Sequence, residues 1–289
     1  MFKGSFTALV TPFTENGQID HARLAELIEL QVTGGITGIV PVGTTGESPT
    51  LSYDEHIKVI ETSVAAAAGR IKVIAGTGAN STEEALSLTQ RAKDAGADGT
   101  LQVTPYYNKP SQEGLYQHFS RVADVGLPVV LYNIPGRTAR EISIETVARL
   151  AQHSNIVAVK EAAGAVERVS AILHVSDLTV LSGDDVLTLP MMSVGGSGVI
   201  SVASNVAPDL VSTMVQAGRD ERWADALALH NRLYPLFNAL LSLDTNPVPI
   251  KAAMALKGLI RDTYRLPMCP ISDENRATLQ SVMTATGLL

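Results

Sequence analysis

Short apolar runs alternate with longer amphipathic stretches between residues 5 and 204. The runs are continuous rather than alternating in polarity, which is typical of strands buried on both faces of a parallel sheet. The stretches between them, such as 21–35, 81–96 and 143–153, repeat their apolar residues at helical spacing. We expect eight strands, lying within residues 5–13, 38–43, 72–78, 99–107, 128–135, 156–162, 178–185 and 198–204.

Capping residues support the predicted helix boundaries. Ser81 followed by Glu84 predicts a capping box at a helix start. Glycines also stand where helices should end, at Gly34, Gly69, Gly96 and Gly126.

Eight strand–helix units of similar length favour an α/β fold, a closed (β/α)8 TIM barrel, over an open doubly wound sheet. An open dinucleotide-binding sheet should carry GxGxxG after its first strand, whereas this strand exits as TPFTENG. The glycine-rich segment 195–198 precedes a strand and is interpreted as a turn. We expect a catalytic barrel over residues 1–219 and a C-terminal helical extension over 220–289, broken at NPVPI (246–250).

Composition narrows the possible partners. The chain has 289 residues, 45% of them hydrophobic, and a formal net charge of −7. An acidic chain without a basic stripe disfavours nucleic acid as a partner. With one cysteine, no apparent signal peptide and no stretch long enough to span a bilayer, we expect a cytoplasmic protein.

We expect the catalytic residues at the carboxyl ends of the strands, because barrel active sites lie there. These ends read VGTTGE, GTGAN, TPYYN, YNIPGR, KEA and SGDD. Hydroxyls, phenols and one lysine dominate them. HExxH, GxSxG and Cys/His clusters are absent from the sequence, so we expect neither a metal nor another cofactor.

Lys160 is the most informative of these residues, because it ends the apolar run IVAVK. Desolvation at the barrel mouth disfavours the ammonium form and frees the amine to attack a carbonyl. The alternative is a structural lysine paired with Glu161 or Asp184. A buried charge is costly unless it is used, which favours catalysis.

The other polar strand ends have two interpretations each. Segment 43–47 (GTTGE) offers amides and hydroxyls to a carboxylate, or is simply a turn with a capping threonine. Tyr106, Tyr107 and Tyr132 could shuttle protons or pack at the rim. Arg137 could bind a carboxylate or be a solvated charge.

Three other features are assigned no catalytic role. His56 follows a helix start and is expected at the surface. Asp184 and Asp185 are better explained by a helix N-terminus than by a carboxylate pair. Cys269 lacks a plausible base.

The motifs GTTGES, AGTGAN, TPYYNKPSQEGLYQHF, LYNIPGRT and VKEAAG, in this order, closely resemble the dihydrodipicolinate synthase family of Schiff-base-forming, pyruvate-dependent lyases. The likeness runs from Phe2 to Leu289. It implies condensation of pyruvate with L-aspartate 4-semialdehyde in the diaminopimelate route to lysine. It also implies that Lys160 forms the imine, that Tyr132 is the general acid/base, and that Thr44 links Tyr132 to Tyr107.

The same resemblance implies the binding residues and the assembly. Thr45 would hold the carboxylate of pyruvate, and Arg137 the carboxylate of the semialdehyde. Backbone groups at Gly183 and Ile200 would line the pocket. Tyr107 would reach into a neighbouring subunit, within a homotetramer built as a dimer of dimers.

An allosteric lysine site is implied at the dimer interface. The residues that match its pattern are Ser48, His56, Asn80, Glu84 and Tyr106. Pro49 and Tyr53 depart from the alanine and histidine of sensitive forms. We therefore expect lysine to bind with weakened inhibition.

Two other functions are compatible with parts of this pattern. N-acetylneuraminate lyases and 2-keto-3-deoxy sugar-acid aldolases share the lysine, the tyrosine and the GxTGE turn, but Arg137 and Tyr107 favour the synthase. A non-catalytic binding barrel would be expected to lose Lys160 or Tyr132, and both are present.

Overall fold

The computed structural model describes residues 1–289 and contains a closed barrel of eight parallel strands in the order β1 to β8. The strands are β1 (Gly4–Ala8), β2 (Gly38–Val40), β3 (Lys72–Gly76), β4 (Gly99–Val103), β5 (Val129–Asn133), β6 (Ile156–Glu161), β7 (Thr179–Ser182) and β8 (Gly198–Ser201). Seven of them lie within predicted runs and β1 begins one residue before its run, so the predicted barrel is confirmed. The runs extend beyond the strands because their ends form the loops of the barrel mouth.

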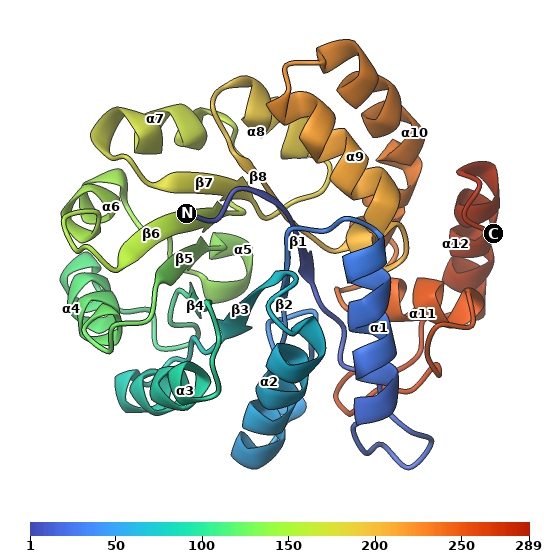
Figure 1. The fold of residues 1–289 in the computed structure, drawn as a ribbon, viewed down its shortest axis with the longest axis horizontal. Coiled ribbons are helices and arrows are strands. Elements are labelled where there is room, and N and C mark those ends of the chain that lie inside the picture. Colours follow the sequence, from blue (N-terminus) through green and yellow to red (C-terminus); the bar gives the residue numbers. More distant parts are fainter.

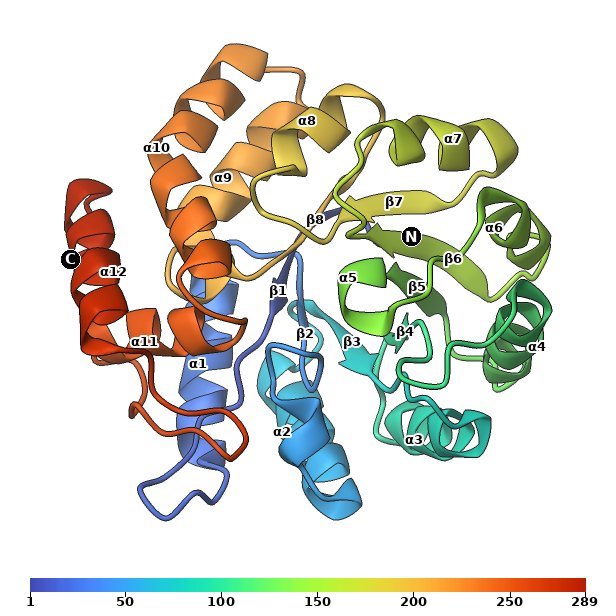
Figure 2. The same cartoon turned by 180° about the vertical axis from the view of Figure 1, so that it is seen from behind.

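Helices surround the barrel (Figure 1). Those between or beside the strands are α1 (His21–Thr33), α2 (Tyr53–Ala67), α3 (Thr82–Asp94), α4 (Gln112–Ala123), α5 (Pro135–Thr138), α6 (Ile144–Leu150), α7 (Glu167–Val175), α8 (Thr188–Ser193) and α9 (Pro208–Arg219). Two short 3-10 helices are η1 (Ser48–Thr50) and η2 (Ala203–Asn205). Figure 2 shows the opposite side, on which α5 crosses the end of β5.

Each strand contributes to a packed barrel interior. One apolar cluster takes a residue from every strand: Phe6, Val40, Ile74, Leu101, Val130, Ala158, Leu181 and Ile200. Because successive side chains in a strand point to opposite faces, the intervening residues face the surrounding helices. Leu131 and Val159, for example, pack in a separate cluster with residues of α4, α6 and α7.

The C-terminal extension is helical, as predicted. It consists of α10 (Trp223–Ser242), α11 (Val248–Leu256) and α12 (Asp273–Ala285). The break between α10 and α11 spans 243–247, so the break predicted at 246–250 overlaps it but runs into the start of α11. These helices lie beside α9 and α1 (Figures 1 and 2). A single apolar cluster joins Val199 of β8 and Met214 of α9 to Phe237 of α10 and Met283 of α12. The extension therefore shares a core with the barrel.

The predicted helix caps are mostly present. Gly34 caps α1, and Gly69, Gly96 and Gly126 have positive φ just after helices α2, α3 and α4. The capping-box prediction at Ser81 is half right. The Ser81 hydroxyl accepts from the Glu84 amide at 3.5 Å, but the complete reciprocal box is found at Ser52 and Glu55.

Candidate active site

Lys160 and Tyr132 are neighbours across β5 and β6, where they occupy paired positions. Both are 5% exposed, and the Lys160 Nζ lies 4.1 Å from the centroid of the Tyr132 ring. Tyr132 belongs to the apolar cluster that fills the barrel interior. Lys160 is its partner in the strand register, so it faces the same side of the sheet. The strand alternation thus brings an amine and a phenol together at the inner face of the barrel mouth.

The ion pairs proposed for a structural Lys160 are absent. Glu161 pairs with Arg168 instead, at 2.9 Å. Asp184 accepts from the backbone N–H of Val186 at 3.0 Å, and burial raises the pKa of its carboxyl group. Lys160 therefore reaches the barrel mouth without a carboxylate partner.

Gly183, just after β7, packs closely against the Lys160 side chain. A Cβ added to Gly183 would lie 3.0 Å from Lys160 Cε and 2.7 Å from Ala162 Cβ, so a larger residue would displace the lysine chain. Ile200 is 1% exposed in the barrel interior. Asp185 accepts from the Ser201 hydroxyl and from two amides at the start of η2, so it caps η2 rather than α8, the helix that follows it in the chain.

A cavity of about 250 Å³ is lined by Tyr132 but not by Lys160, whose Nζ lies against the Tyr132 ring. Thr44, Tyr132 and Arg137 line the cavity together, although they come from three separate segments. No hydrogen bond joins Thr44 to Tyr132 within the chain. Tyr107 does not line the cavity: it is 89% exposed, with a left-handed backbone (φ 73°) that presents its ring to solvent.

Thr45 and Arg137 are linked by Asn246, which the sequence interpretation missed. The Asn246 side chain donates to Thr45 Oγ1 at 3.0 Å, and its carbonyl accepts from Arg137 Nη2 at 3.1 Å. Thr45 is 3% exposed, whereas Arg137 lies on the exposed surface of α5. The segment between α10 and α11 thus connects the two residues expected to bind carboxylates.

A buried ion pair, which the sequence did not predict, anchors the GTTGE turn to α11. Glu47 has a left-handed backbone (φ 55°), and its carboxylate contacts Lys251 Nζ of α11. Lys251 is 0% exposed, and burial lowers the pKa of its ammonium group. The amides of Gly46 and Glu47 close the turn by donating to Gly43 and Thr44 carbonyls, while those of Thr44 and Thr45 donate to no protein acceptor. Two amides therefore remain free to bind an anion.

Part of the expected lysine site lies at the cavity. Ser48, Pro49 and Tyr106 line the cavity itself. Burial, and after it the negative charge of Glu84, raises the pKa of both Tyr106 and Tyr53, so Glu84 lies near both phenols. Asn80 lies nearby in the chain, its carbonyl accepting from Asn108 at 2.8 Å.

The expectation that His56 lies at the surface is wrong. His56 is 5% exposed, and its Nε2 donates to the Gly76 carbonyl at 2.8 Å. Burial lowers the pKa of this imidazole to about 4. Its spacing from Ile60, Ser63 and Ala67, all buried, places it on the barrel-facing side of α2 and could have revealed this from the sequence.

The structure has no metal-binding cluster and no membrane-spanning helix. No group of three or more His, Cys, Asp or Glu side chains lies close enough together to hold a metal ion. None of the helices is both long and apolar enough to span a bilayer.

Known proteins resemble the whole chain. A model of the dihydrodipicolinate synthetase family matches residues 1–286. The 4-hydroxy-tetrahydrodipicolinate synthase of Pelobacter propionicus is 50% identical over 292 residues, covering 100% of both chains. A dihydrodipicolinate synthase of Acinetobacter baumannii, solved in complex with pyruvate, gives a TM-score of 0.98 at 43% identity, with 100% of both chains covered. The dihydrodipicolinate synthase of Cyanidioschyzon merolae, solved with lysine bound, gives a TM-score of 0.96 at 42% identity, covering 100% of this chain and 99% of that one.

Proposed function

This chain belongs to the dihydrodipicolinate synthetase family of enzymes, and we propose that it condenses pyruvate with L-aspartate 4-semialdehyde through a Schiff base on Lys160. One observation carries the assignment of the lysine. Its Nζ lies buried against the ring of Tyr132 at 4.1 Å, Tyr132 in turn lines the cavity, and Lys160 has no carboxylate partner. An amine so placed is positioned to react with a carbonyl rather than to stabilise a charge.

The proposed reaction begins with attack of the Lys160 amine on the ketone carbon of pyruvate. The carbinolamine loses water to give an imine, and loss of a methyl proton gives an enamine. The enamine carbon then attacks the aldehyde carbon of the semialdehyde, whose oxygen takes up a proton. The semialdehyde amine displaces Lys160 from the imine carbon, closing the ring and returning the free lysine.

Tyr132 is the group placed to move the protons of these steps. Its phenol is 5% exposed and lines the cavity beside Lys160. General acid/base catalysis of this kind contributes typically ~10² to 10⁴-fold. Thr44 lines the same cavity and would connect Tyr132 to Tyr107 of a neighbouring subunit.

The two substrate carboxylates would bind at different places. Thr45 with the free amides of the GTTGE turn suits the carboxylate of pyruvate, because successive amides form an anion-binding concavity. Arg137 at the cavity rim suits the carboxylate of the semialdehyde, through its planar guanidinium. Gly183 and Ile200 would complete the wall behind Lys160.

The choice of aldehyde tests this function against that of the sugar-acid lyases. We expect turnover with pyruvate and L-aspartate 4-semialdehyde, and none with pyruvate and N-acetylmannosamine. Turnover of the sugar alone would assign the protein to the lyases. No turnover of either aldehyde by a folded protein would favour a non-catalytic binding barrel.

The proposed assembly is a homotetramer of tight dimers. The exposed, left-handed Tyr107, which lies outside the cavity of its own chain, supports a role at a neighbour's site. Sedimentation should give the mass of four chains. A fully active monomer would remove both the tetramer and the role of Tyr107.

We further propose a cytoplasmic location and a barrel domain over 1–219 with an extension over 220–289. We also propose that lysine binds near Ser48, Asn80, Glu84 and Tyr106, with weakened inhibition. His56 would support that site from behind rather than contact lysine, because its ring is buried. A lysine titration at constant substrate should show binding with partial inhibition. No effect on rate and no binding heat up to millimolar lysine would contradict the regulatory site.

A further inference from the structure

A buried polar network lies directly behind the Lys160–Tyr132 pair, on the outer face of the same two strands. Asn133 follows Tyr132 in β5, and Glu161 follows Lys160 in β6, and these two residues are also paired in register. Side-chain alternation therefore turns Asn133 and Glu161 away from the cavity. Both are 0% exposed.

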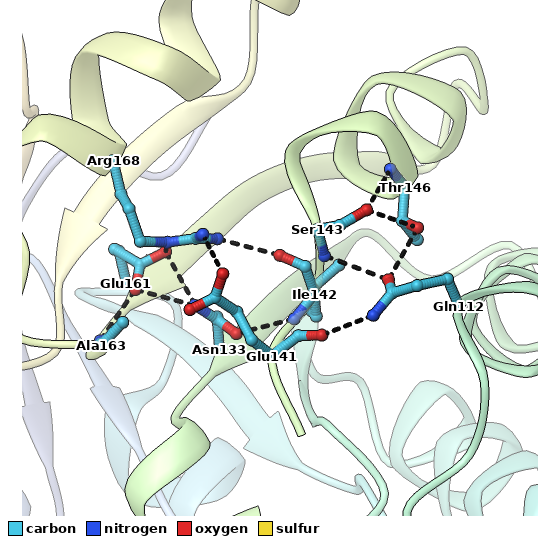
Figure 3. A network of polar contacts seen from close by, with 9 residues as sticks. All are labelled: Gln112, Asn133, Glu141, Ile142, Ser143, Thr146, Glu161, Ala163 and Arg168. Carbon is cyan, nitrogen blue, oxygen red and sulfur yellow. Dashed lines mark hydrogen bonds and ion pairs between the residues drawn. The ribbon is translucent and has the colours of Figure 1, made fainter. Parts of the chain in front are cut away.

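The Glu161 carboxylate accepts hydrogen bonds from Asn133, Ala163 and Arg168 (Figure 3). Asn133 Nδ2 donates to its two carboxylate oxygens at 2.9 and 3.0 Å, and Arg168 Nε donates at 2.9 Å. The backbone N–H of Ala163 donates at 2.8 Å. The strands β5 and β6 are thus joined by side chains, in addition to their backbone ladder, at the residues next to the reactive pair.

Arg168 of α7 fixes this arrangement to the loop before α6 (Figure 3). Its Nη2 donates to the Ile142 carbonyl at 2.9 Å, and its Nη1 pairs with Glu141 at 2.6 Å. The Ile142 amide in turn donates to Asn133 Oδ1 at 3.0 Å. Asn133 is therefore bonded on both sides, and the network closes on itself.

The irregular pairing of β5 with β6 gives the network a role in fixing the strand register. The register between these strands shifts between Val129 and Val130, near their start. A slip of one residue at the other end would turn Lys160 or Tyr132 to the outer face, because strand side chains alternate with a period of two. An isolated buried carboxylate is costly, so the Asn133–Glu161–Arg168 contacts are satisfied only in the observed register.

We propose that Asn133, Glu161 and Arg168 are positioning residues that hold Lys160 and Tyr132 in the register needed for imine formation. None of the three lines the cavity, and Asn133 and Glu161 face away from Tyr132 and Lys160 in their strands, so the network acts through the reactive pair. The proposal rests on the proposed function of Lys160. Their loss should slow the chemical steps and leave substrate binding by Thr45 and Arg137 nearly unchanged.

The test compares Glu161→Gln with Val169→Ala. Gln keeps the shape of the side chain but removes the charge that pairs with Arg168. Val169 is 0% exposed in the same helix as Arg168 but packs in the apolar cluster, so its truncation costs stability without touching the network. We measure unfolding, steady-state rates with both substrates, and the rate of borohydride trapping with pyruvate, at a temperature where each variant is folded.

For Glu161→Gln we expect kcat and the trapping rate to fall by about ten- to a hundredfold, as expected for a small misplacement of reacting groups. KM for the semialdehyde should change by less than about threefold. Val169→Ala should keep kcat and the trapping rate within about twofold of wild type. Unchanged rates in Glu161→Gln, or equal losses in Val169→Ala, would overturn the positioning role.

A conservative variant protects the test against misfolding of Glu161→Gln. Arg168→Lys keeps the buried cation but lacks the guanidinium fork that bonds Glu161, Glu141 and Ile142 together. We expect a trapping rate about three- to tenfold lower with KM unchanged, and a wild-type rate would overturn the proposal. If wild-type protein itself forms no adduct at Lys160, the proposed function fails instead, which is a separate result.

Discussion

The buried pair of Glu47 and Lys251 gives the sharpest prediction for stability. It joins residues 204 positions apart, with the Glu47 side chain 1% and the Lys251 side chain 0% exposed. The ammonium also lies over the Phe13 ring at 4.3 Å and the Tyr264 ring at 4.9 Å. The perturbation we choose is Lys251→Met, because methionine keeps the unbranched chain and makes favourable sulfur–aromatic contacts.

The expected loss of stability follows from the Glu47 charge that Lys251→Met leaves unpaired. Lys251→Met leaves the Glu47 carboxylate buried, with only the Arg265 amide donating to it at 3.3 Å. Removing one partner of a buried ion pair costs about 3–5 kcal/mol, because the other charge stays uncompensated. Replacing both charges, in Glu47→Gln with Lys251→Met, should bring stability to within about 2 kcal/mol of wild type. The free energies of unfolding should therefore be strongly non-additive.

Guanidinium unfolding of the wild type, both single variants and the double variant measures this cycle. Lys257→Met is a matched control, because Lys257 Nζ bonds only the Leu288 carbonyl near the end of the chain. We expect it to lose less than about 1 kcal/mol. A loss below about 1 kcal/mol for Lys251→Met, or losses that simply add in the double variant, would refute the reasoning.

Three further predictions concern pH, catalysis and substrate binding. Burial lowers the pKa of His56 and His118 to about 4, so below pH 6.5 the unfolded chain binds more protons than the folded chain. The contribution of each histidine to the free energy of unfolding is therefore complete above pH 6.5, and that free energy should fall by about 2 kcal/mol per histidine between pH 7 and pH 5. Thermal unfolding in that range checks this, and His56→Gln should flatten the dependence by about half; a curve that stays flat in wild type would contradict it. Lys160→Ala should lower kcat by at least about 10³-fold with an unchanged circular dichroism spectrum, whereas loss of folding would favour a structural lysine. Arg137→Ala should raise KM for the semialdehyde by about 10- to 100-fold while the trapping rate with pyruvate stays constant, and an unchanged KM would remove its carboxylate-binding role.

Much of the fold was predictable because local pattern and global architecture agree. The continuous apolar runs required strands with both faces covered, and their regular alternation with helices required a barrel. Lys160 was identifiable for a related reason: a charged residue that ends an apolar run is unusual, and the barrel register places it at the mouth.

The supporting contacts were not predictable, because their partners are distant in sequence. Lys251 stands in the apolar segment IKAAMAL and carried the same signal as Lys160, but only the folded chain shows that it meets Glu47. Asn246 gave no sequence signal at all, since its role comes from two contacts with separate loops. His56 was misjudged because its position after a helix start was given more weight than its helical spacing.

Trapping of a pyruvate adduct tests the role of Lys160 most directly. Protein incubated with pyruvate and reduced with borohydride should gain the mass of one reduced pyruvate adduct per chain, mapped to the peptide that contains Lys160. Lys160→Ala should gain none under the same conditions. An adduct on any other lysine of the wild-type protein, or no adduct at all, would contradict the proposed mechanism.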